Sequence, residues 1–264
     1  MKEVMNEPVL TPDPWSPLRQ HTDARIALGR AGGSLPTAEL LRFALDHAEA
    51  RDAVHDELDF DALETSLAGL NLPIVRVETR VGDRATYLRR PDRGRSLDAA
   101  SRARLREIAV ESPDGEIAII IADGLSAQAA QRYAAPVLAE LLPMLRDKGL
   151  RMTPLTLARH ARVALQDDIA SALGAPAAII LLGERPGLHA PVSLGAYFVY
   201  NPVVGTTDDC RNCVSNVRDN GLSPTAAAQT LFYLVTEALR RKISGVQLKD
   251  ERFPAVLTAD SRLS

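Results

Sequence analysis

Two unbroken apolar runs stand out in the second half of the chain. Residues 117–122 read IAIIIA and residues 177–182 read AAIILL, and neither run contains a polar position. Short runs without polar alternation are typical of strands that are buried on both faces of a parallel sheet. They are too short to cross a membrane as helices. We therefore expect both runs to be central strands.

Segments with apolar residues at helical spacing alternate with strand-like segments around these runs. Gly149 and Gly174 follow two of the helical segments and are expected to end them. Pro136 and Pro143 should kink or divide the first helix. The further elements predicted in this half are helices over residues 126–148, 163–173 and 224–242, and strands over residues 150–157 and 196–200.

The alternation of strands and helices with short turns predicts the α/β class, with a doubly wound, mostly parallel sheet. Because carboxyl ends of parallel strands meet at one edge, residues 123–126, residues 183–188 and the segment after residue 201 should lie together. Open α/β sheets bind ligands at this edge. Glu184 and Arg185 are candidate ligand contacts there, and a turn with a solvated ion pair is the alternative.

The first half of the chain is less regular. Residues 1–17 contain four prolines and Trp15, the only tryptophan, and are expected to be a flexible arm that a partner chain could order. Residues 18–110 are predicted to be mostly helical, with a broad apolar face on a helix that begins near Thr37. Residues 87–95, YLRRPDRGR, form a basic segment that we interpret as a solvated turn, with an acidic partner surface as the alternative.

This pattern divides the chain into four parts. The arm and the helical region are followed by the α/β domain over residues 111–250. Residues 251–264 are expected to be a loose tail. A strand over residues 74–79 and a helix over residues 98–110 are the further elements expected in the helical region.

Composition narrows the classes of function. The chain has 264 residues, a formal net charge of −3 and two cysteines. A negative net charge argues against nucleic acid as the main partner, because phosphate neutralisation needs a basic surface. Two cysteines are too few for a disulfide framework. We recognise neither a signal peptide nor a membrane span, and expect a soluble cytoplasmic protein without a membrane partner.

The residues do not form a convincing catalytic set. Cys210 and Cys213 form a CxxC motif, but no further cysteine or nearby histidine completes a zinc site. A thioredoxin-type redox pair would be expected at the N-terminus of a helix near the start of the fold. Ser126 does not lie in a G-x-S-x-G turn. Asp123 and Glu184 could form a pair of carboxylates for acid/base chemistry, but the sequence does not determine the distance between them. These residues are better explained by a binding subunit that has no catalytic and no metal-ligating residue of its own. We expect its polar loop after residue 201 to line a ligand.

Seven segments between roughly residues 18 and 245 carry a specific resemblance. Together, and in this order, they resemble the small (light) subunit of ethanolamine ammonia-lyase, an adenosylcobalamin-dependent family. The segments are LRQHTDARIALGRAGGSLPTAELLRFALDHAEARDAV, YLRRPDRGR, IADGLS, ARVALQDDIASALGA, LLGERPGL, SLGAYFVY and RNCVSNVRDNGLS.

The resemblance implies conversion of ethanolamine to acetaldehyde and ammonia, with the large subunit as partner in a hetero-oligomer and no activity of the small subunit alone. It implies a Rossmann-like domain that holds adenosylcobalamin between the two chains. Val163 would pack on the cofactor, Glu184 would accept hydrogen bonds from its amide side chains, and Cys213 would be a polarizable wall. The D-x-H-x-x-G motif is absent, so the benzimidazole of the cofactor is expected to stay on cobalt.

Two other classes of function remain open at this point. A stand-alone nucleotide-dependent enzyme needs a glycine-rich phosphate turn after its first strand, and residues 121–126, IADGLS, match that turn poorly. A non-catalytic adaptor of a metabolic complex is the second alternative. Longer N-terminal extensions in the family are associated with packaging into bacterial microcompartments. With the short arm of this chain we expect a cytoplasmic location, with a microcompartment as the alternative.

Overall fold

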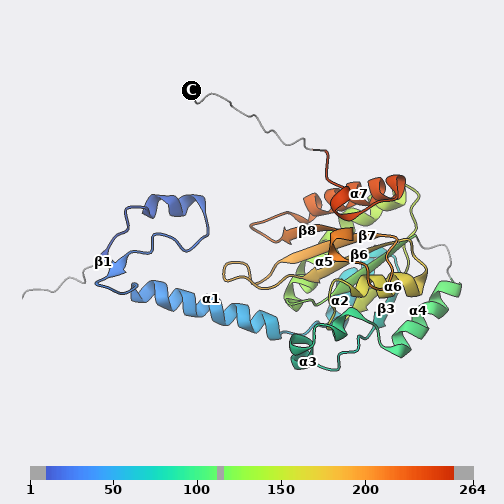
Figure 1. The fold of residues 1–264 in the computed structure, drawn as a ribbon, viewed down its shortest axis with the longest axis horizontal. Helices are drawn as coiled ribbons and strands as arrows, with labels where there is room; N and C mark the ends of the chain where they lie inside the picture. Colours follow the sequence, from blue (N-terminus) through green and yellow to red (C-terminus); the bar gives the residue numbers. More distant parts are fainter. Residues whose placement is uncertain (1–9, 112–115, 253–264) are drawn as a thin grey trace, which may run out of the picture.

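A six-stranded sheet forms the centre of the computed structural model, which describes residues 10–111 and 116–252 (Figure 1). The four strands β3, β5, β4 and β6 run parallel to one another, and β7 and β8 are antiparallel to their neighbours. The chain is therefore an α/β protein with a mixed sheet. In spatial order the strands are β3 (Ile74–Val77), β5 (Leu155–Ala158), β4 (Ile117–Ala122), β6 (Ala177–Gly183), β7 (Leu194–Tyr200) and β8 (Arg211–Val217).

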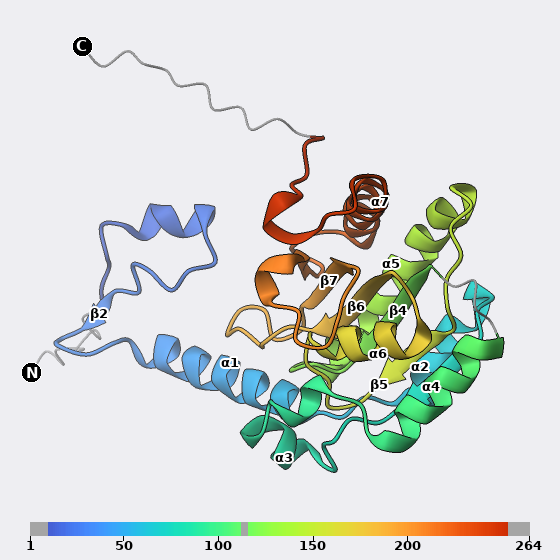
Figure 2. The same ribbon diagram turned by 45° about the vertical axis from the view of Figure 1, so that its right-hand side comes forward.

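Helices cover both faces of this sheet (Figure 2). Along β4, the side chains of Ile117, Ile119 and Ile121 enter one apolar cluster, and those of Ala118 and Ile120 enter the other. All are buried, as the polar-free run predicts. The helices on the first face are α2 (Phe60–Leu67), α5 (Ala127–Asp147) and α7 (Pro224–Arg241), and those on the second are α4 (Ala99–Glu111) and α6 (Leu165–Leu173).

The direction of β7 corrects one prediction. The connection from β6 to β7 contains no helix, so the chain turns back and Gly183 pairs with Leu194, while Ala177 pairs with Tyr200. The segment after residue 201 therefore starts at the opposite edge of the sheet from the turns after β4 and β6. The expectation that all three turns share one edge was wrong.

The segment RNCVSNV was also wrongly interpreted as a loop. It forms the edge strand β8, in which Val214 and Val217 are buried and Cys213 pairs with Tyr197 of β7. These two valines were the only apolar signal in a polar context, which made the strand difficult to predict from the pattern.

Helix α5 contains both of its prolines without a break. Pro136 and Pro143 are seven residues apart and exposed, so they lie on the solvent side of the helix. The carbonyl groups that lose a hydrogen-bond partner there remain open to water. The expected division of this helix does not occur.

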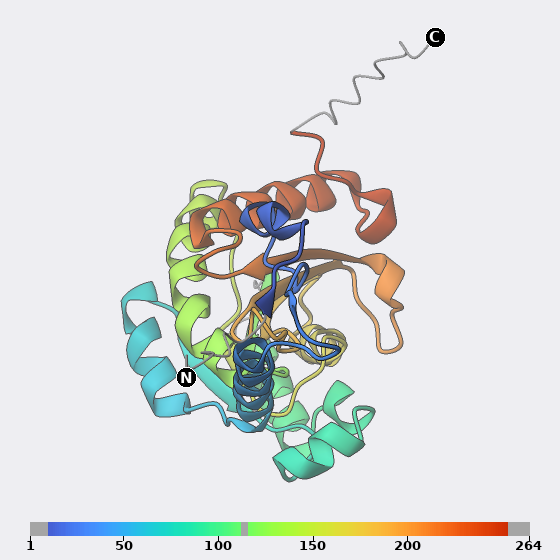
Figure 3. The same cartoon turned by 90° about the vertical axis from the view of Figure 1, so that its left-hand side faces the viewer.

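The N-terminal segment extends away from the sheet (Figure 1), and in Figure 3 it projects toward the viewer. Strand β1 (Leu10–Thr11) pairs with β2 (Arg30–Ala31), and helix α1 (Thr37–His55) has Ala53 as its one buried residue. The predicted apolar face of α1 is therefore largely uncovered by this chain. The exposed large apolar residues of this segment are Leu10, Trp15, Leu18, Leu35, Leu40, Leu41, Phe43 and Leu45.

The arginines of the basic segment 87–95 are exposed, as expected for a solvated turn, but the segment also contains part of a helix and a buried aromatic residue. It spans the end of helix α3 (Arg84–Arg89) and a 3-10 turn (Arg93–Arg95), and Tyr87 is fully buried, with its hydroxyl donating to the Ala161 carbonyl oxygen at 2.7 Å.

Parts of two predictions lie outside the described residues, namely residues 1–9 of the arm and 253–264 of the tail. Within the described ranges, none of the helices combines the length and the apolar character needed to span a bilayer.

Candidate functional site

Val163, Glu184 and Cys213 lie on three different elements at one side of the sheet. Val163 is half-buried in the turn before α6, Glu184 is half-buried directly after β6, and Cys213 is exposed on β8. Val163 and Cys213 line the same cavity, which has a volume of about 320 Å³ and also includes Tyr197. The fold thus brings together two residues that are fifty positions apart in the sequence.

Glu184 is not among the residues that line this cavity, although its charge acts on Cys213, which does line it. Its Oε2 atom accepts a hydrogen bond from the Ser193 hydroxyl at 2.6 Å and another from the backbone N–H of Asn216 at 3.2 Å. Its negative charge contributes to raising the pKa of Cys213. Within the described part of the chain Glu184 makes no ion pair with Arg185, so the alternative of a solvated ion pair was wrong.

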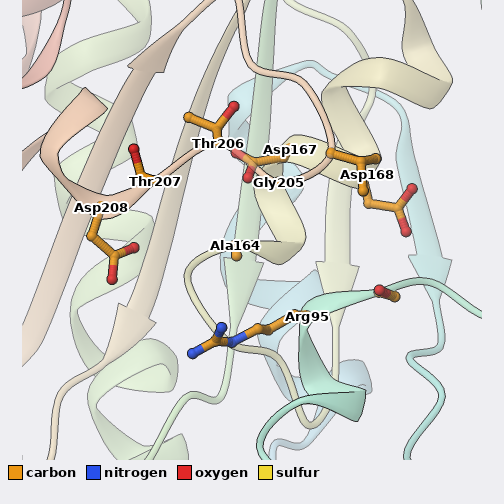
Figure 4. A pocket seen from close by; sticks show the side chains of 10 residues that line it. Arg95, Ala164, Asp167, Asp168, Gly205, Thr206, Thr207 and Asp208 are labelled. Atoms are coloured by element: carbon orange, nitrogen blue, oxygen red, sulfur yellow. The ribbon is translucent and has the colours of Figure 1, made fainter.

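A second cavity, of about 330 Å³, adjoins the first and shares Arg95, Ala164 and Asp208 with it (Figure 4). We call the two together the α6–β8 groove. Its far end is lined by Asp167, Asp168 and the loop 204–208. The polar loop after residue 201 therefore does line a hollow, although it starts at the other edge of the sheet.

A buried charge network forms the floor of the groove. The Arg211 guanidinium donates to both carboxylate oxygens of Asp167, at 2.6 and 2.7 Å, and to the Thr206 carbonyl oxygen at 2.7 Å. Asp168 accepts from the Leu97 backbone N–H at 2.8 Å. Each of these aspartates is almost fully buried at the start of α6, so the network fixes that helix against β8.

The surroundings of Asp123 are those of a carboxylate with a structural role. Asp123 is 1% exposed, and its carboxylate accepts from the Arg84 guanidinium and the His160 N–H, both at 2.9 Å, and from the Ala161 N–H at 3.2 Å. These donors tie the ends of β4 and β5 to α3. A carboxylate enclosed in this way does not pair with Glu184 for acid/base chemistry.

The turn after β4 offers little to a phosphate group. The backbone N–H of Leu125 donates to the Gly183 carbonyl oxygen at 2.9 Å, and that of Ser126 donates to the Asp123 carbonyl oxygen at 3.1 Å. A nucleotide-phosphate turn needs such amides to be free. This geometry disfavours the stand-alone nucleotide-dependent enzyme.

The two cysteines are free thiols. Cys210 belongs to a short 3-10 turn (Asp208–Cys210) and Cys213 to β8, so the CxxC is not at the N-terminus of an α-helix. In residues 10–111 and 116–252 no group of three or more potential ligands is arranged to hold a metal ion.

Arg95, Arg162, Tyr197 and Arg211 line the first cavity and are among the residues that were not singled out from the sequence as site residues. Arg162 is the neighbour of Val163, and this adjacency was an available signal. The other three reach the cavity from a turn and two strands whose pairing the pattern did not reveal.

Iodoacetamide should alkylate Cys213 slowly near pH 8. Desolvation by the surrounding atoms is the largest effect and raises the pKa of this thiol. The hydrogen bond with Tyr197 lowers the pKa by less, and the charge of Glu184 raises it by a smaller amount still. Since the thiolate is the reacting form, the midpoint of the pH–rate profile should lie above that of the same chain unfolded in urea. The Cys210→Ser variant leaves one thiol to report this midpoint.

In the same background, Glu184→Gln should move the midpoint to lower pH, because it removes a negative charge near the thiol. Glu140→Gln, on the exposed side of α5, should leave it unchanged. A folded midpoint at or below the unfolded one would show that the thiol is not desolvated.

Comparison with known proteins gives a consistent result. Residues 12–249 match the family described as "Ethanolamine ammonia-lyase light chain (EutC)". The chain is 51% identical over 242 residues to the "Ethanolamine ammonia-lyase small subunit" of Azotobacter vinelandii, covering 91% of this chain and 90% of that protein. It is 47% identical over 260 residues to the protein of the same name from Rhodopseudomonas palustris, covering 98% and 99%. The protein of the same name from Ralstonia nicotianae is 48% identical over 254 residues, which cover 96% of this chain and 94% of that protein.

Proposed function

Because the chain belongs to the ethanolamine ammonia-lyase light-chain family, we propose that it is the small subunit that holds adenosylcobalamin against a large subunit. The reaction of the complex is the conversion of ethanolamine to acetaldehyde and ammonia. We assign most contacts with the cofactor to the Rossmann-like part of the chain, residues 111–250. The observation that carries this proposal is the cavity that Val163 and Cys213 line together.

The residues around the cavity fit parts of a cobalamin. Val163 and the Cys213 thiol offer apolar and polarizable contact to its rings. The Oε1 atom of Glu184 accepts no hydrogen bond from the described residues, so it is available to an amide side chain of the cofactor. The Nε atom of Arg162 is buried and has no hydrogen-bond partner in the described part of the chain, so it is a free donor. An unpaired buried donor costs stability unless a ligand accepts from it.

The roles of this chain in the proposed complex are binding and orientation. When bound, the cofactor supplies an adenosyl radical by homolysis of its cobalt–carbon bond. Val163, Glu184 and Cys213 are proposed as binding residues and not as catalytic residues, and the groups that act on ethanolamine are assigned to the large subunit. A cavity of about 320 Å³ encloses only part of a cobalamin, in agreement with a site that a second chain completes.

The exposed apolar side chains of α1 and the N-terminal segment support a partner chain. A contiguous exposed apolar surface is typical of a protein–protein contact, and Trp15 is the kind of residue that anchors one. We propose the large subunit as that partner in a hetero-oligomer. The cytoplasm is the proposed location, with a bacterial microcompartment as the alternative.

The test is reconstitution with the large subunit of the family. Purified alone, this chain should produce no acetaldehyde from ethanolamine, and the two chains together should do so only with adenosylcobalamin. Glu184→Arg combined with Cys213→Trp should weaken cobalamin binding by about 100-fold or more, because a cation replaces a hydrogen-bond acceptor and a large ring fills the cavity. Binding is measured by equilibrium dialysis, and turnover by acetaldehyde release.

Glu140→Arg on α5 is the matched control for charge reversal, and it should bind cobalamin like the natural chain. Full cobalamin-dependent turnover by the Glu184→Arg, Cys213→Trp complex would refute the assignment of the site. Turnover by the chain alone would refute the assignment of a binding role.

A further inference from the structure

The cavity described above carries more positive than negative charge. Arg95, Arg162 and Arg211 line it, together with the single carboxylate of Asp208. Arg211 is already bound by both oxygens of Asp167, and Asp208 lies 3.3 Å from Arg211. Neither Arg95 nor Arg162 forms an ion pair with any of the described residues. Two guanidinium groups therefore lack a counter-charge at this site.

Arg162 is held in a position that leaves hydrogen-bonding capacity unused. Its guanidinium carbon lies 4.3 Å from the centre of the Tyr87 ring, and its Nε atom is buried without a partner. The stacking fixes the plane of the guanidinium, and that plane contains its donors. An acceptor that entered the cavity would therefore meet a guanidinium whose plane is already fixed.

Arg95 has a fixed backbone and a free side chain. The carbonyl oxygen of Gly94 accepts from the Arg162 N–H at 2.8 Å, and a Cβ atom at Gly94 would come within 2.6 Å of the His160 carbonyl oxygen. On the other side, the Leu97 N–H donates to Asp168. Figure 4 shows the Arg95 side chain reaching across the groove toward the side that carries Asp208. Its guanidinium is exposed and positioned at the junction of the two cavities.

We propose that Arg95, together with Arg162, forms the subsite for the phosphodiester of the cofactor's nucleotide loop. This inference rests on the proposed function. Cobalamin carries a single phosphodiester, whereas its amide side chains are neutral, so the phosphodiester is the group that an excess of guanidinium charge selects. The planar fork of arginine matches two phosphate oxygens. The same cavity is of a size suited to a nucleotide and not to a whole corrin.

The test compares two corrinoids on the complex of this chain with the large subunit. Cyanocobalamin contains the nucleotide loop, and dicyanocobinamide lacks the loop and its phosphodiester. Arg95→Gln should weaken cyanocobalamin binding by about 10-fold to 100-fold, the loss expected for one charge-assisted hydrogen-bonded contact, and should change cobinamide binding by less than about 2-fold. Arg95→Lys should fall between, because it keeps the charge but not the fork. Equilibrium dialysis with absorbance detection gives both dissociation constants.

Arg93→Gln is the matched control, because Arg93 is exposed on the same 3-10 turn and does not line the cavity. It should bind both corrinoids like the natural chain. Equal weakening of both corrinoids by Arg95→Gln, or no weakening of cyanocobalamin, would overturn the subsite while leaving the proposed function standing. If the natural complex bound neither corrinoid, the proposed function itself would fail.

Discussion

Replacing Arg211 with methionine is expected to lower the free energy of unfolding by about 3–5 kcal/mol. The Arg211 and Asp167 side chains are each only 2% exposed, and two hydrogen bonds of 2.6 and 2.7 Å join them. Methionine fills much of the same space but leaves the Asp167 carboxylate buried without its partner. The cost of that unpaired charge exceeds the net value of the ion pair itself. The measurement is urea denaturation of the natural and variant chains, followed by circular dichroism.

The double variant Arg211→Met, Asp167→Leu should recover most of this loss, because apolar side chains can replace a buried pair at little cost. Arg240→Ala, which removes a surface ion pair with Glu237 on α7, is the control and should change the free energy of unfolding little. An Arg211→Met variant as stable as Arg240→Ala would show that the network under the groove does not hold α6 and β8 together.

Gly183→Ala should also be strongly destabilising, with a loss of free energy of unfolding of about 3 kcal/mol. A Cβ atom at Gly183 would overlap the backbone carbonyl oxygen of Ser126, and one at Gly124 would overlap the carbonyl oxygen of Gly183. The obstacle in each case is backbone and not a flexible side chain. Gly124→Ala carries the additional cost of a positive φ of 54°. Both variants should unfold at lower urea concentration. If the chain has the proposed function, both should also weaken cobalamin binding, because Glu184 follows Gly183 directly.

Gly149→Ala separates the steric clash of an added Cβ atom from the strain of a positive φ angle. Gly149 has a φ of 74°, and a Cβ atom there would meet nothing within 4 Å, so only conformational strain of about 1 kcal/mol is expected. If Gly183→Ala were no more destabilising than Gly149→Ala, the close packing of the turns after β4 and β6 would not be needed for the fold.

The site was only partly predictable from the chain. Val163, Glu184 and Cys213 were proposed as cofactor contacts through the resemblance to a family, and the pattern alone favoured ordinary structural roles for all three. Arg95 is a clear example of what the pattern missed. It belongs to a basic segment that is typical of a solvated turn, and its neighbour Gly94 brings it to the groove by packing against the loop after β5.

Local patterns determined the elements that are buried on both sides. Runs without polar residues predicted strands β4 and β6, and apolar residues at helical spacing predicted helices α5, α6 and α7. Each pattern favours one conformation within a single segment, because continuous burial of apolar side chains can be read from neighbouring residues in the sequence. The α/β class followed from them.

Tertiary structure alone decided the direction of β7, the formation of β8 and the pairing of Arg211 with Asp167. Strand direction depends on how a connection packs, and an ion pair between residues 44 positions apart depends on two elements meeting. Neither is specified by periodicity, because periodicity records only which side of an element is apolar and not which element covers it.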